Sequence, residues 1–136
     1  MRLTKVEDGV AVVACSTCRH AADQRTDAAG VAGGARLAEA LRQVQASDPR
    51  YGAIAVQDMP CLFACQDFCT VHLRAPGKVG YVLGRFAPTA DAARAILDYA
   101  AHYSYSEAGQ VPYRAWPEGV KGHFLTRTPP PGFVVE

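Results

Sequence analysis

The stretch YGAIAVQDMPCLFACQDFC, residues 51–69, joins a short apolar run to a closely spaced group of cysteines. Its first part, residues 51–57, carries isoleucine and valine and predicts a short buried strand. The strand runs directly into a loop that holds three thiols in nine residues: Cys61, Cys65 and Cys69. We therefore expect a strand that ends at a cluster of thiols, at one end of a sheet.

A second group of cysteines follows another apolar run nearer the start of the chain. Residues 9–14, GVAVVA, are rich in valine and also predict a buried strand. This strand leads into the sequence CSTC, which places Cys15 and Cys18 directly at its end. With the later group, the chain has five cysteines, which are too clustered to be incidental.

The segments around these two strands predict two helices and a hairpin. Leu37, Leu41 and Val44 recur at helical spacing, and this helix should end near Ser47 because a proline follows Asp48. Residues 70–74 and 79–83 alternate apolar and polar side chains around the turn APGK and predict a hairpin. Thr89 is a suitable N-cap for a second helix, and we interpret residues 19–33 as a loop.

The order strand, helix, strand, hairpin, helix places the two cysteine groups together. The first two strands should be parallel with a right-handed crossover, so their carboxyl ends lie at the same edge of the sheet. Open α/β sheets usually bind ligands at that edge. The complete order is that of the thioredoxin core, and we expect an α/β fold with a central mixed sheet.

The end of the chain predicts a packed but irregular extension. Prolines at 112, 117 and 129–131 argue against regular structure, whereas several aromatic and aliphatic residues argue against a solvated tail. We expect residues 1–106 to form the thioredoxin-like, metal-binding domain. Residues 107–136 should be a proline-rich extension packed on the same domain.

Composition limits the classes of partner and the compartment. The 14 basic and 13 acidic residues are mixed along the chain and give a net charge of +1, so nucleic acid and membrane are not expected as partners. The charged N-terminus does not resemble a signal peptide, and we expect a cytoplasmic protein. Cytosolic thiols are kept reduced, so clustered cysteines there indicate metal binding or redox chemistry.

Three chemistries are compatible with the thiols. Four thiolates can hold either zinc or a 2Fe-2S cluster, and the spacing of the second group, Cys-x3-Cys-x3-Cys, favours iron and sulfide over the paired Cys-x2-Cys of many zinc sites. Dithiol exchange at Cys15 and Cys18 is the third interpretation. It is disfavoured because a loop, not a helix, should follow CSTC.

The motifs together resemble a known group of proteins. CSTC after a valine-rich strand, then CLFAC, then GKVGYVLG and a helix after Pro88, resemble the thioredoxin-like 2Fe-2S ferredoxins. The segments PYRAWPEGV and RTPP extend a nearer resemblance over almost the whole chain. That nearer group is a family of small bacterial proteins described as predicted metal-binding and often linked to cobalamin biosynthesis.

The resemblance implies a ligand set and a function. It implies that the cluster is held by Cys15, Cys18, Cys61 and Cys65, with Cys69 as a candidate substitute ligand. Residues inside or beside the first turn are candidates to stabilise the negative charge of such a cluster: Ser16, Thr17 and Arg19. The resemblance also implies that the protein pairs as a homodimer.

The predicted function is that of a one-electron carrier that exchanges electrons with a redox partner protein, rather than an enzyme. The alternatives are a zinc- or cobalt-binding protein associated with cobalamin biosynthesis and, less favoured, a thioredoxin-like dithiol oxidoreductase.

Overall fold

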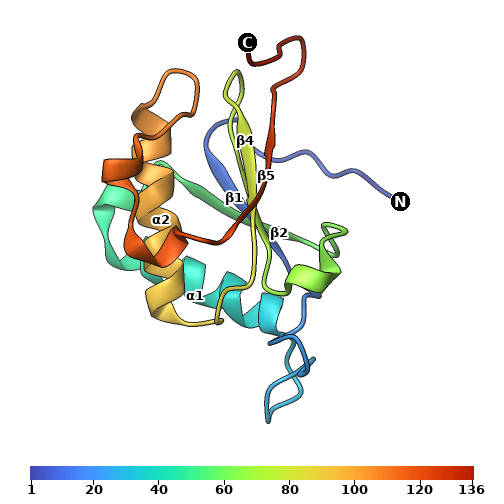
Figure 1. Ribbon diagram of the computed structural model, residues 1–136. Helices are drawn as coiled ribbons and strands as arrows, with labels where there is room; N and C mark the ends of the chain where they lie inside the picture. Colours follow the sequence, from blue (N-terminus) through green and yellow to red (C-terminus); the bar gives the residue numbers. More distant parts are fainter.

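The computed structural model describes the whole chain, residues 1–136, and shows a five-stranded mixed sheet with two helices against it (Figure 1). The strands lie in the order β2-β1-β3-β4-β5; β1 and β2 are parallel, and the other neighbours are antiparallel. Their bounds are β1 (Ala11–Cys15), β2 (Ala55–Met59), β3 (Val71–Arg74), β4 (Gly80–Leu83) and β5 (Phe124–Thr128). The predicted α/β fold with a mixed sheet is confirmed.

The helices are α1 (Gly33–Ser47) and α2 (Ala90–Tyr105). The predicted apolar face of α1 is buried, and the helix ends where Asp48 begins a short 3-10 turn over Pro49–Tyr51. The Thr89 side chain caps α2 by accepting a hydrogen bond from the Ala92 N–H at 3.2 Å. Neither helix combines the length and the apolar character that crossing a bilayer requires.

The hydrophobic core lies between the sheet and the two helices. Period-two alternation along the strands directs one set of side chains to this core. These strand residues are buried and pack with α1 and α2: Val12, Ala14, Val71, Leu73, Tyr81 and Leu83. The second predicted strand is displaced along the chain, because Tyr51 belongs to the 3-10 turn and β2 begins at Ala55.

The C-terminal segment contains regular structure that the sequence did not indicate. Trp116 contacts Tyr99 of α2 and donates a hydrogen bond from Nε1 to the Val111 carbonyl at 2.8 Å. The expectation of an irregular tail is wrong for Phe124–Thr128, which pairs with β4 as the edge strand β5. Figure 1 shows β5 running alongside β4 at that edge of the sheet.

Candidate metal centre

The adjoining ends of β1 and β2 bring the two cysteine groups together. In the parallel register Cys15 lies opposite Met59, so CSTC and CLFAC leave the sheet side by side. The Ser16 N–H donates to the Met59 carbonyl at 2.9 Å, and this bond extends the pairing beyond the strands. The predicted meeting of the two loops at one edge is therefore confirmed.

The first pair, Cys15 and Cys18, is buried. Cys15 is only 1 % exposed and Cys18 5 %. The Cys15 N–H donates to the carbonyl of Thr70 at 3.0 Å, and the Thr70 hydroxyl lies 3.2 Å from the Cys18 sulfur in a hydrogen bond. Both cysteines of CSTC are thus held by the residue that precedes β3.

The first turn of α1 packs directly on this pair. The Gly34 N–H donates to the Cys18 carbonyl at 3.1 Å. A Cβ at Gly34 would lie 1.7 Å from the Cys15 carbonyl oxygen, a distance that no side chain tolerates. Because Gly34 has no Cβ, the positive end of the helix dipole lies close to the CSTC turn. No acidic residue in the first turn of α1 offsets this positive end.

The second pair, Cys61 and Cys65, faces solvent. Cys61 is partly exposed and Cys65 is exposed, and their sulfurs lie 3.7 Å apart. Two residues of this loop that are not glycine have positive φ, Cys61 at 64° and Phe63 at 60°. Such strained backbone is concentrated at functional sites, and here it leaves the Phe63 side chain 93 % exposed at the loop tip.

Burial and hydrogen bonding shift the pKa values of the thiols in both loops. Burial alone would raise the pKa of Cys15, but hydrogen bonds from the Cys18 thiol and from the backbone of Leu62 and Thr17 outweigh it and lower this pKa to about 7. Leu62 belongs to the second loop, so both loops contribute to the lowered pKa of Cys15. Burial raises the pKa of Cys18 despite its bond with Thr70, and hydrogen bonding to Cys61 raises the pKa of Cys65.

The second cysteine pair has the spacing of two thiolates on one metal ion. Two sulfurs on one tetrahedral metal ion with bonds of about 2.3 Å lie about 3.8 Å apart, close to the 3.7 Å between Cys61 and Cys65. The five cysteines are all free thiols. The four candidate ligands form two pairs, and no three side chains of ligand type converge on one point.

Cys69 belongs to neither pair, although it lies near the first one. Its side chain is completely buried, and its thiol donates a hydrogen bond to the Arg19 carbonyl at 3.3 Å. Burial raises the pKa of Cys69 to about 12, so the thiol keeps its proton at neutral pH. A buried thiol that donates to a backbone carbonyl has the surroundings of a structural cysteine.

The three residues predicted to surround the sulfurs differ in what they contact. The Thr17 hydroxyl lies 3.8 Å from the Cys15 sulfur, whereas Ser16 contributes its N–H to the sheet edge. The Arg19 guanidinium donates to the Ala22 carbonyl, and its positive charge acts on Cys65. Sequence reasoning missed Thr70, which no motif marks, and the effect of the Leu62 backbone on the pKa of Cys15.

Comparison with known proteins places the chain in a family. A family model described as "Protein of unknown function (DUF1636)" matches residues 12–130, a range that contains all five cysteines. The chain belongs to this family. The comparison with curated proteins gave no match.

One solved structure shows that the chain has a thioredoxin-like architecture. A thioredoxin-like [2Fe-2S] ferredoxin from Aquifex aeolicus superposes with a TM-score of 0.55 at 16% identity, covering 94% of this chain and 100% of that one. A second structure, the wild-type thioredoxin-like [2Fe-2S] ferredoxin from the same organism, gives 0.44 at 19% identity over 60% and 77% of the two chains. The first similarity shows the fold, and the second is too weak to add to it.

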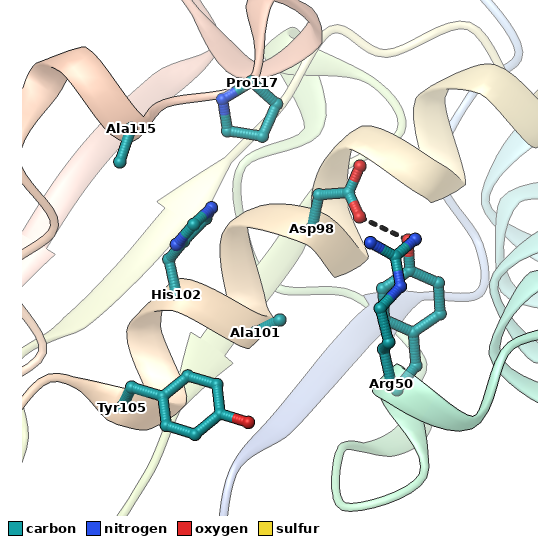
Figure 2. A pocket seen from close by; sticks show the side chains of 8 residues that line it. Arg50, Asp98, Ala101, His102, Tyr105, Ala115 and Pro117 are labelled. Atoms are coloured by element: carbon teal, nitrogen blue, oxygen red, sulfur yellow. Dashed lines mark hydrogen bonds between the residues drawn. The ribbon is translucent and has the colours of Figure 1, made fainter.

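A hollow on the helical side of this DUF1636 protein lies away from the thiols. The pocket, of about 370 Å³, is lined by Arg50, Tyr51, Asp98 and His102, among others. Figure 2 shows Arg50, Asp98 and His102 around this hollow. The Tyr51 hydroxyl donates a hydrogen bond to Asp98. Tyr51 precedes β2 and Cys61 follows it, so the pocket and the cysteine pairs lie at opposite ends of that strand.

Proposed function

We propose that this protein is a one-electron carrier that holds a 2Fe-2S cluster through Cys15, Cys18, Cys61 and Cys65. The observation that carries the proposal is the position of two cysteine pairs at the adjoining carboxyl ends of β1 and β2. The thioredoxin-like fold supports it. When bound, such a cluster supplies a one-electron couple at a potential that its surroundings set.

The buried pair provides the electrostatic support that a negatively charged cluster needs. The backbone of Leu62 and Thr17 lowers the pKa of Cys15 and so favours its thiolate, and the N-terminus of α1 lies against the same turn. Fixed donors and a helix N-terminus favour negative charge without reorganisation. This side of the site therefore holds and stabilises the cofactor.

The exposed pair provides the route for the electron. Cys65 and Phe63 lie at the surface, so a partner protein reaches the ligands of this side without any rearrangement of the fold. A redox partner protein is part of the proposal. Exchange of a thiol with a disulfide substrate is disfavoured, because Cys15 is buried and α1 begins only at Gly33, well after CSTC.

The test is the composition and spectrum of protein purified without oxygen. We expect a reddish-brown protein with about two irons and two acid-labile sulfides per chain and an EPR signal that appears on one-electron reduction. Cys65→Ser should lose or distort this spectrum, and Cys69→Ser is the matched control that should leave it unchanged. A protein with one zinc or cobalt ion per chain and no labile sulfide would overturn the proposal in favour of the metal-binding alternative.

A further inference from the structure

Thr70 occupies an unusual position beside the first cysteine pair. It is 1 % exposed and is the one buried polar residue of the chain, tyrosines aside. Its carbonyl accepts from the Cys15 N–H at 3.0 Å, and its hydroxyl lies 3.2 Å from the Cys18 sulfur. One residue therefore contacts both cysteines of CSTC.

The Thr70 hydroxyl has Cys18 as its hydrogen-bond partner. With a protonated thiol, either atom can donate. A metal-bound Cys18 is a thiolate with no proton, so the hydroxyl must then be the donor. A hydrogen bond to a charged acceptor is shorter and roughly twice as strong as one between neutral groups, and burial keeps water from replacing it.

We propose that the Thr70 hydroxyl donates a hydrogen bond to the Cys18 sulfur and raises the reduction potential of the bound cluster. This inference rests on the proposed function. One-electron reduction adds one negative charge and transfers no proton, and a donor directed at a ligand sulfur stabilises that added charge. Thr70 is thus a positioning residue that acts through Cys18.

The surroundings of Thr70 favour valine as the replacement that removes only the donor. The Thr70 Cγ2 methyl packs close to Gly84: a Cβ added to Gly84 would lie 3.0 Å from this methyl. Valine keeps that methyl and the β-branched shape suited to the start of β3. The matched control is Thr126→Val, an exposed threonine on β5 that makes no contact with a thiol.

The experiment is a redox titration of anaerobically purified protein, followed by EPR and visible absorption. Thr70→Val should shift the potential to a more negative value, whereas Thr70→Ser, which keeps the hydroxyl, and Thr126→Val should match the wild type. An intact cluster in Thr70→Val with the wild-type potential would overturn the inference. If Thr70→Val does not fold, Thr70→Ala lacks the same donor at smaller volume and carries the same expectation.

Failure of the proposed function gives a different result. If the wild-type protein contains neither iron nor labile sulfide, the proposed cluster is refuted. There is then no reduction potential for Thr70 to change. If Thr70→Val and Thr70→Ala both lose the cluster while Thr70→Ser retains it, the hydroxyl is needed for assembly, and its assignment as a determinant of potential is overturned.

Discussion

Cys69 differs from the four proposed ligands in its surroundings. It is completely buried, it donates to the Arg19 carbonyl, and burial raises its pKa to about 12. The ligand pairs instead lie at the ends of β1 and β2, where hydrogen bonds reach their sulfurs. A structural role as a small buried donor accounts for these features of Cys69.

Replacement of Cys69 by serine should therefore leave the cofactor in place. The serine hydroxyl can still donate to Arg19, so we expect a loss of only about 1 kcal/mol in the free energy of unfolding. Iron content, labile sulfide and the visible spectrum should equal those of the wild type. Cys18→Ser is the comparison and should lose or distort the spectrum; the reverse pattern in the two variants would identify Cys69 as the ligand.

The sequence predicted the cysteine pairs but not the residues that support them. Cys15, Cys18, Cys61 and Cys65 stand in motifs directly after apolar runs, so local pattern was sufficient to place them at strand ends. Thr70 looks like any threonine at the start of a strand. Its contact with Cys18 spans 52 positions in sequence and depends on the pairing of β1 with β3, which no local pattern encodes.

At the scale of elements, α1 is fixed to the site by its first turn. The helix has no side-chain N-cap, and its N-terminus is anchored by the Gly34 N–H to the Cys18 carbonyl instead. The close approach to Cys15 depends on the missing Cβ at Gly34. The helix and the cysteine turn are thus one packing unit.

Gly34→Ala should separate the two parts of this unit. The added methyl collides with the Cys15 carbonyl oxygen, so the helix must move, at a cost of about 3 kcal/mol in the free energy of unfolding and with loss of bound iron. Urea denaturation and iron analysis measure both effects. Gly52→Ala is the control, because Gly52 has φ of −61° and its Cβ would have no contact closer than 3.3 Å. Equal stability and iron content in wild type and Gly34→Ala would contradict this role.

Helices and edge strands differed in how far sequence could predict them. The apolar spacing of α1 and the Thr89 cap of α2 are local signals, and both helices were placed correctly. Strand β5 has exposed threonine and arginine side chains and is followed by three prolines, so it has no alternation of its own to mark it. It forms because β4 offers a free edge, and the register shifts between Val82 and Leu83.

At the scale of the whole molecule, the core contains buried groups that ionise only at high pH. The Tyr103 hydroxyl donates to the Val79 carbonyl at 2.6 Å, and burial raises the pKa of Tyr103 to about 12. The Tyr99 hydroxyl is buried without a hydrogen-bond partner, and burial raises its pKa as well. With Cys69, these groups keep their protons in the folded protein under conditions where an unfolded chain loses them.

Stability should therefore fall as pH rises above about 9. The ordinary pKa is 9.0 for the thiol and 10.0 for the phenols, and the folded pKa values of Cys69 and Tyr103 are about 12. Between these limits the unfolded chain binds fewer protons than the folded one, so each group lowers the free energy of unfolding by up to about 1.4 kcal/mol per pH unit. Below about pH 9 these groups are protonated in both states, so their contribution to the free energy of unfolding no longer changes with pH.

Urea denaturation from about pH 8 to about pH 11.5 measures the fall in the free energy of unfolding. Two tyrosine variants show which group causes it. Tyr99→Phe removes one buried ionisable group, so its stability should decline less steeply above about pH 10 than that of the wild type, with little change near neutral pH because the hydroxyl has no partner. Tyr105→Phe alters a tyrosine that is 91 % exposed and should follow the wild-type curve. Comparison of slopes between variants cancels any pH dependence of the metal centre, which they share. Parallel curves for wild type and Tyr99→Phe would show that ionisation of the buried tyrosines does not limit the alkaline stability of the fold.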